Sequence, residues 1–373
     1  MLQPLPIEPR LVPVIFHWVI TILCIALAVR YLMSNDNTNL LKKNTPIGGI
    51  LLSVALIIWM GMRTSNGSVY GDSSTYRYSY ENFITPLYST IKWDEEWFFG
   101  VIGTWCKSNG FNYVGYFLTI EIGYIGFMLL ANWKLLWENV WLAMLFAFSA
   151  FSFFTFGTNG LRNGLACSMV MVAIVFVATE KKYGWAVAVG MCVLALGVHR
   201  STMLPIMCLL AAATVVKDTK TALYFWIASI PISLVAGSAV TNYFASWELD
   251  ERMASYGKEA VEGSGFSHVG FRWDFLLYSA MPVWLISYIV FQRNIKDRAF
   301  HIISTVYLLS NAFWVMVCRS SFSNRFAYLS WFIYPLVIAY PMIRMKIWKN
   351  QDMRVGWILL AHAGFSMFMF LVY

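Results

Sequence analysis

Apolar stretches about as long as a membrane is thick recur along the whole chain, and this repetition constrains the fold more than any other feature. About twenty apolar residues form a helix that crosses the hydrocarbon core of a bilayer. Because 59% of the residues are hydrophobic and only 12% are charged, little sequence is left for a separate soluble catalytic domain. We predict an all-α polytopic integral membrane protein with about 12 transmembrane helices in a single domain, 1–373, with the first span retained. The twelve spans are expected at about 11–33, 46–62, 113–131, 137–156, 161–179, 184–198, 202–216, 222–241, 273–291, 300–317, 326–343 and 355–372.

The distribution of basic residues predicts which side of the membrane each loop faces. If the loop with Lys42 and Lys43 is cytoplasmic, alternation of the spans places 15 basic residues on the cytoplasmic side and five in the short outer loops. Cytoplasmic loops are enriched in Lys and Arg, so both termini are expected outside. Two longer outer loops then cover about 63–112 and 242–272, and long loops are left out of the count because they cross largely regardless of charge.

Lysine and arginine differ in their predicted placement. Ten of the 13 lysines fall on the cytoplasmic side, whereas nine of the 14 arginines fall outside. Lysines at cytoplasmic helix ends are explained as orientation signals near anionic lipid. The outer arginines need another reason, and a planar guanidinium that binds phosphate through two hydrogen bonds is one. The alternative is ordinary ion pairing, because the outer face holds twelve acids against twelve bases.

Five outer arginines are candidates for binding a diphosphate. Arg162 opens a span in TNGLRNGLACS, where the positive end of a helix dipole suits a bound anion better than a structural cation. Arg319 and Arg325 flank a short outer turn, and Arg63 and Arg272 border the two long outer loops. Two or three of these side chains on one cavity would hold a diphosphate without metal. The alternatives are an arginine that snorkels to the surface and, for Arg272, an ion pair with a nearby acid.

Two outer residues are candidates for accepting a proton. His199 ends a span in ALGVHRSTMLP and forms a tight outer turn with Arg200 and Ser201. Neutral imidazole can accept a proton from a hydroxyl near pH 7, although His199 would also suit a role in capping helix carbonyls. Asp72 is the other candidate, because Gly71 permits a tight turn that aims its carboxylate at the membrane face. The alternative for its segment is a solvated polar loop.

Other acidic and apolar segments have simpler explanations. The run Asp94 to Glu96 would suit a divalent cation or a base, but a solvated loop is the interpretation we prefer. Glu121 lies inside a span and should face the bundle interior, for helix packing or as part of a proton path. The apolar segment 97–107 is too short to span, and should lie along the outer interface or re-enter the membrane. The six cysteines form no CxxC motif, and we expect no metal and no cofactor.

Several of these motifs resemble the EpsG family of exopolysaccharide polymerases, which are related to the Wzy O-antigen polymerases. The resemblance covers most of residues 10–215. Where the family usually has Gln after its helix-start arginine, this chain has Asn163, and residues 242–300 carry no matching motif. The matching residues are a basic loop after the first span, Arg63, Gly71, Asp72, Tyr76, Phe83, Arg162, Gly164, Leu165, Ala166, the Lys181-Lys182 turn, the corner Gly197, His199 and Ser201, and Asn324, Arg325 and Phe326.

The resemblance implies a GT-C-like bundle in the bacterial inner membrane, with its active site on the periplasmic side. A glycan would pass from an undecaprenyl diphosphate-linked donor to the non-reducing-end hydroxyl of a lipid-linked oligosaccharide acceptor. The expected partners are these lipids and a Wzz-like chain-length regulator, and no nucleic acid. The implied roles are a base at His199 or Asp72, diphosphate binding by Arg162, Arg325, Arg63, Arg272 and Arg319, and further substrate contacts from Tyr76, Arg77, Arg200 and Ser201.

Two other functions fit part of the sequence. In a polyprenyl-phosphate-sugar glycosyltransferase, the acidic run Asp94 to Glu96 would be the catalytic element. A flippase or transporter of lipid-linked oligosaccharide would need a charged cavity that opens in turn to both faces. The charged candidates here gather at one predicted face, apart from Glu121, which favours an enzyme over a transporter.

The predicted orientation can be tested by cysteine labelling. With Lys182→Cys and Lys258→Cys variants in intact cells, an impermeant thiol reagent should label position 258 and not position 182. The chain without either substitution measures background labelling. Labelling at 182 but not at 258 would reverse the predicted orientation.

Overall fold

The computed structural model describes residues 2–34, 41, 46–180, 182–245, 270–321 and 323–372. The chain forms two compact units, one of Met1–Met203 with Ile338–Tyr373 and the other of Leu204–Val337. We call these unit 1 and unit 2. The basic residues Lys42, Lys43 and Lys181 and most of the predicted outer loop 242–272 lie outside the described residues. The expectation of one transmembrane domain over 1–373 stays a prediction.

Within the described residues the chain is helical, without β-strands, and eight helical segments are long and apolar enough to cross a membrane. Three shorter apolar helices add to them. The prediction of an all-α polytopic membrane protein is confirmed, and the chain is a multi-pass membrane protein.

Helices α9 and α6 form the interior of unit 1. Almost every residue of α9 is buried, because α6, α8 and α10 all pack against it. Helix α1 lies at the periphery against α18 and exposes apolar residues such as Ile22, as expected for a surface facing lipid. The helices of unit 1 are α1 (Leu11–Leu32), α2 (Ile47–Gly61), α3 (Gly67–Tyr70), α4 (Ser73–Asn82), η2 (Tyr88–Thr90), α5 (Trp97–Ser108), α6 (Tyr113–Leu136), η3 (Trp137–Asn139), α7 (Val140–Phe148), α8 (Phe153–Thr158), α9 (Leu161–Thr179), α10 (Gly184–Val198), η4 (Arg200–Thr202) and α18 (Gln351–Val372).

In unit 2, a buried asparagine on α15 joins several helices. Asn311 accepts a hydrogen bond from Trp226 Nε1 at 2.8 Å and donates to the hydroxyls of Ser279 (3.1 Å) and Ser330 (2.9 Å). A buried amide whose groups are all bonded fixes the register of its neighbours, because a slipped helix would leave those groups without partners. The helices are α11 (Met203–Thr214), α12 (Thr219–Ala245), α14 (Trp273–Ser287), η5 (Tyr288–Arg293), α15 (Arg298–Met316) and α16 (Ser323–Trp331), and α17 (Tyr334–Arg344) carries the chain back to unit 1.

The predicted span at 137–156 differs most from the structure. It is divided into η3, α7 and α8, and α7 ends at Phe148. Asn139 caps α7 by accepting from Leu142 N at 3.2 Å, and the Ser149 hydroxyl turns back to Leu145 O at 2.6 Å. Irregular backbone at membrane depth is tolerated only where protein covers it, and every residue of α7 except Trp141 is buried. Polar residues within an apolar stretch therefore mark helix ends here.

A buried ion pair joins α6 to the segment that follows α2. Arg63 and Glu121 are both fully buried, and Arg63 Nη1 lies 3.4 Å from Glu121 Oε1. The guanidinium also donates to Met60 O and, at 3.1 Å, to Thr158 O, and it lies over the Phe117 ring at 4.9 Å. Glu121 faces the bundle interior, as predicted, and its contact with Arg63 favours the helix-packing role.

Removal of one member of this pair should destabilise unit 1 strongly. Glu121→Ala leaves the Arg63 guanidinium buried without its acid, which should cost about 3–5 kcal/mol of unfolding free energy. The matched control is Glu81→Ala, which breaks the exposed Arg77–Glu81 pair and should cost less than about 1 kcal/mol. Unfolding of the purified variants by SDS titration in detergent measures both values. Equal stability of the two variants would contradict the structural role.

Candidate functional site

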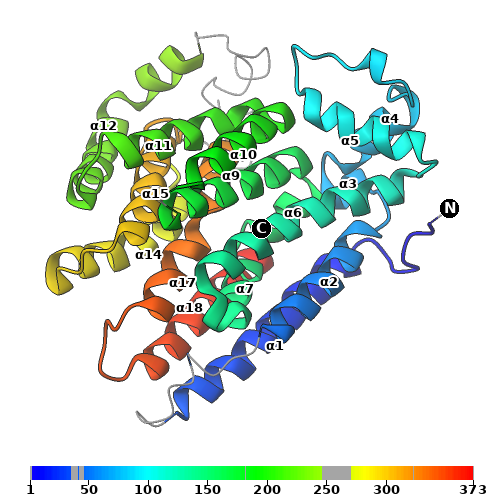
Figure 1. The fold of residues 1–373 in the computed structure, drawn as a ribbon. Helices are drawn as coiled ribbons and strands as arrows, with labels where there is room; N and C mark the ends of the chain where they lie inside the picture. The colour runs from blue at the N-terminus through cyan, green and yellow to red at the C-terminus, as the bar shows by residue number, and fades with distance from the viewer. Residues whose placement is uncertain are drawn as a thin grey trace. The chain divides into compact units, whose positions relative to one another are not determined.

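Four helix ends of unit 1 bring Tyr76, Glu96, Arg162 and His199 together, and we call these residues the Glu96 cluster. Tyr76 lies on α4, Glu96 is the N-cap residue of α5, Arg162 lies in the first turn of α9, and His199 is the C-cap residue of α10. Helices α3, α4 and α5 lie together at one end of the long helices of unit 1 (Figure 1). The cluster therefore occupies the end of α9 that these short helices adjoin.

The Glu96 carboxylate is the centre of the cluster. Its Oε1 lies 2.5 Å from His199 Nδ1, and its Oε2 accepts a hydrogen bond from Arg162 Nη1. The three side chains are only 16% (Glu96), 21% (Arg162) and 24% (His199) exposed, so little water screens their charges. One carboxylate thus holds both a guanidinium and an imidazole in place.

Arg162 is fixed on its other side by aromatic residues. Its Nε donates to the Tyr76 hydroxyl at 3.3 Å, and its guanidinium carbon lies 5.5 Å from the Tyr76 ring centroid and 5.9 Å from that of Phe99. Arginine has five N–H donors, and these contacts engage only part of them. The side chain keeps donors for a further partner while its position is set by the protein.

A glycine allows α10 to approach α5 closely enough to form the cluster. A Cβ on Gly197 would lie 2.7 Å from Trp97 Cε2, closer than real side chains pack. Trp97 directly follows Glu96, and His199 comes two residues after Gly197 in extended backbone at φ −156°. The absence of a side chain at Gly197 thus lets Glu96 and His199 meet.

Asp72 lies at the start of α4, beside the cluster's tyrosine. Gly71 before it has φ +53°, a left-handed conformation that favours glycine, and Asp72 N donates to Asn159 Oδ1 at 2.8 Å. Asp72 and Tyr76 are four residues apart and share a face of α4. The structure therefore holds Asp72 against the turn before α9, one helical turn from the Glu96 cluster.

Two tyrosines fasten α3 and α4 to the rest of unit 1. Tyr70 donates to Pro9 O at 2.8 Å and Tyr80 to Phe111 O at 2.7 Å. Burial raises the pKa of the Tyr70 hydroxyl to about 12 and raises the pKa of the Tyr80 hydroxyl as well. Both phenols therefore stay protonated at neutral pH and keep donating. The segment predicted as a candidate site is anchored to the bundle.

The remaining predicted site residues of unit 1 lie in other surroundings. Arg63 is buried against Glu121, as described above. Arg77 is half-exposed, pairs with Glu81 at 2.9 Å and lies over the Tyr113 ring at 4.2 Å. Arg200 and Ser201 lie in η4, directly after His199. Their predicted contacts with substrate stay predictions.

Three predicted arginines belong to unit 2. Arg272 donates to both carboxylate oxygens of Asp274 at 2.9 and 2.6 Å, which is the pairing considered as its alternative. Arg319 Nε lies near Gly237, at 3.0 Å from where a Cβ would stand, and Arg325 lies on α16. Diphosphate binding by Arg272, Arg319 and Arg325 stays a prediction.

The cluster contains one residue that sequence reasoning assigned to a solvated loop. Glu96 ends the acidic run Asp94 to Glu96. The other two acids fit the solvated interpretation, because both are exposed and Glu95 lies 2.9 Å from Lys92. The available signal was its place directly before the apolar helix 97–108, because such a helix packs its N-cap residue against the bundle. Asn159, which accepts the hydrogen bond from Asp72 N, had no feature in the sequence that would have identified it.

The arrangement defines a class: a helical multi-pass membrane protein with a partly buried carboxylate, imidazole and guanidinium at one end of its bundle. The model of the EpsG family matches residues 49–373, and the chain belongs to this family. Membership indicates a glycosyltransferase-type polymerase of polysaccharide biosynthesis. The predicted family is thereby confirmed. No curated protein and no solved structure matches the chain.

A methyl group at Gly197 should disturb the Glu96 cluster without unfolding the protein. In Gly197→Ala the Cβ would push Trp97 away, displace Glu96 from His199 and lower polymer formation at least about tenfold. Gly190→Ala is the matched control on the same helix, because a Cβ at Gly190 meets nothing within 4 Å. Polymer length on gels and protein level in membranes measure the two effects. Equal polymer from both variants would show that this close approach is unimportant.

Proposed function

We propose that the chain transfers a glycan from an undecaprenyl diphosphate-linked donor to the non-reducing-end hydroxyl of a lipid-linked oligosaccharide repeat. The reaction takes place at the outer, periplasmic face of the bacterial inner membrane. The observation that carries the proposal is the contact of Glu96 Oε1 with His199 Nδ1 at 2.5 Å, beside Arg162 on the other carboxylate oxygen. Family membership supplies the reaction class.

His199 is the proposed general base. An ionised carboxylate can only accept hydrogen bonds, so Nδ1 carries the proton that it donates to Glu96. The lone pair of the imidazole is then on Nε2, the atom that faces away from Glu96. A base held in one orientation by an acid follows the same logic as the catalytic triads of hydrolases.

Arg162 is the proposed stabiliser of the leaving group. Departure of a lipid diphosphate develops negative charge, and a guanidinium already held in place stabilises that charge more in the transition state than in the ground state. Its position in the first turn of α9 adds the positive end of the helix dipole. Pairing with Glu96 lowers the net positive charge around Arg162. Directed hydrogen bonds to the diphosphate are therefore the main contribution of this arginine.

The proposed step is a single displacement. His199 Nε2 takes the hydroxyl proton while the acceptor oxygen bonds to the anomeric carbon of the donor. The bond from that carbon to the diphosphate oxygen breaks, and undecaprenyl diphosphate leaves with the electron pair. A divalent metal is not part of the proposal, because Glu95 and Glu96 already face the cations of Lys92 and Arg162. A Wzz-like regulator of chain length is the proposed protein partner.

The position of Glu96 also favours a second candidate, a polyprenyl-phosphate-sugar glycosyltransferase in which this carboxylate is itself the base. The two candidates differ in donor and in the roles of two residues. In the second, Glu96 would touch the acceptor hydroxyl, and His199 would only position it.

The roles of His199 and Glu96 can be separated by single-turnover kinetics with purified protein and an undecaprenyl diphosphate-linked repeat. His199→Gln should lower the turnover rate about 10²–10⁴-fold with donor affinity little changed, because it removes the base. Glu96→Gln should lower turnover less, since the imidazole remains. The matched control Glu95→Gln, which changes a neighbouring exposed acid, should leave turnover within about twofold.

Other outcomes would reassign the chemistry. Asp72→Asn with the large loss, and His199→Gln with weakened donor binding only, would make Asp72 the base. A larger loss in Glu96→Gln than in His199→Gln, together with turnover of a polyprenyl monophosphate donor, would favour the second candidate. Unchanged turnover in all three variants would remove the cluster from the reaction.

A further inference from the structure

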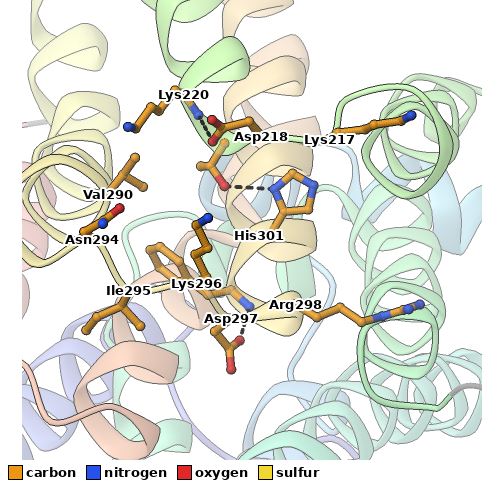
Figure 2. A pocket seen from close by; sticks show the side chains of 12 residues that line it. Lys217, Asp218, Lys220, Val290, Asn294, Ile295, Lys296, Asp297, Arg298 and His301 are labelled. Carbon is orange, nitrogen blue, oxygen red and sulfur yellow. Dashed lines mark hydrogen bonds between the residues drawn. The ribbon is translucent and has the colours of Figure 1, made fainter.

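Unit 2 contains a cavity of about 560 Å³ whose lining holds four basic and two acidic residues. It lies where the turn before α12, the end of η5 and the start of α15 meet, far in sequence from the Glu96 cluster. Figure 2 shows His301 in the middle of these residues, with Lys296 on one side and Lys217 and Arg298 on the other. The fourth basic residue of the lining is Lys220.

The lysines of this cavity, Lys217, Lys220 and Lys296, make no ion pair in the part of the chain that the structure describes. Two acids belong to the lining as well: Asp218 accepts from Lys220 N at 3.0 Å and Asp297 accepts from Phe300 N at 2.7 Å. Four basic side chains against two acidic ones leave the lining with a net positive charge, so a bound anion would be stabilising.

His301 makes the basic wall rigid. Its Nε2 donates to Val216 O at 2.9 Å, which leaves Nδ1 to accept from the Thr219 hydroxyl at 2.9 Å. These bonds join α15 to the turn that carries Lys217 and to the start of α12, which carries Lys220. Helices α12 and α15 pack together along their lengths and both begin at this cavity, so their dipoles add positive charge to it.

An exposed apolar surface adjoins the basic wall. Tyr224 on α12 is 58% exposed and Phe291 on η5 is 45% exposed, and their ring centroids lie 6.0 Å apart. Lys220 Nζ lies 5.5 Å from the Phe291 centroid, so the two surfaces are continuous. Ile227, one turn further along α12, is 50% exposed as well. This apolar surface suits the acyl chains of a lipid, whereas a small soluble anion would make no contact with it.

We propose that this cavity binds the phosphate headgroup of an anionic diacyl phospholipid, with the acyl chains along Tyr224, Ile227 and Phe291. Basic pockets between transmembrane helices on the cytoplasmic side are known to suit such headgroups. The predicted orientation places Lys217, Lys220, Lys296 and Arg298 on that side. The lipid would hold α12, η5 and α15 together at their membrane ends.

The test uses native mass spectrometry of the purified full chain in detergent, titrated with phosphatidylglycerol or with phosphatidylcholine of the same acyl chains. Phosphatidylglycerol should bind at one saturable site and at least about tenfold more tightly than phosphatidylcholine. Lys220→Gln combined with Lys296→Gln should weaken phosphatidylglycerol binding about 30-fold, at about fivefold per lysine near an anionic headgroup.

The matched control combines Lys346→Gln with Lys349→Gln, which removes the same charge from exposed lysines outside the cavity and should change affinity less than about twofold. A variant that combines Lys220→Arg with Lys296→Arg should retain phosphatidylglycerol binding. It replaces the Gln variant in the test if the Gln variant does not accumulate in the membrane. Equal affinity for the two lipids, or equal losses in the two Gln pairs, would overturn the proposal. Displacement of phosphatidylglycerol by inorganic phosphate at millimolar concentration would assign the cavity to free phosphate instead.

Discussion

Membrane hydrocarbon offers a charged side chain no water, so each charge within the bundle has to meet a group of the protein itself. Arg63 and Glu121 show this constraint in the interior of unit 1, where both are fully buried. The pair joins α6 to the segment after α2, and the Arg63 bond to Thr158 O adds α8. Since α3 and α4 follow Arg63 directly, this interaction also sets where the candidate site begins.

The Glu96 cluster obeys the same constraint at the end of the bundle. Glu96 on α5 meets Arg162 on α9 and His199 at the end of α10, and Tyr76 joins α4 to the cluster through Arg162. Because these side chains are largely buried, water screens their charges little and the contacts stay strong. The same side chains that join this end of unit 1 are therefore the ones to which we assign the proposed base and hydrogen-bond donor.

The charged residues at the predicted cytoplasmic face differ between the two units. Lys134 pairs with Glu180 at 2.5 Å and Arg344 pairs with Glu138, which joins the ends of α6, α9 and α17 in unit 1. The lysines around the unit 2 cavity have no such acids among the described residues. The pairs of unit 1 join helix ends, whereas the proposed lipid site of unit 2 rests on lysines that make no ion pair with any described residue.

The sequence by itself determined the all-helical membrane fold, because apolar length decides which segments leave water. It also identified Arg162, His199 and Asp72 as candidates, since an arginine at a helix start and a histidine at a helix end can be recognised from the local sequence pattern. It failed at 137–156, where Asn139 and Ser149 divide a predicted span, and at Glu96, which resembled its solvated neighbours. Only the tertiary structure decided that Glu96 joins Arg162 and His199, because partners 66 and 103 residues apart are set by helix packing and not by local pattern.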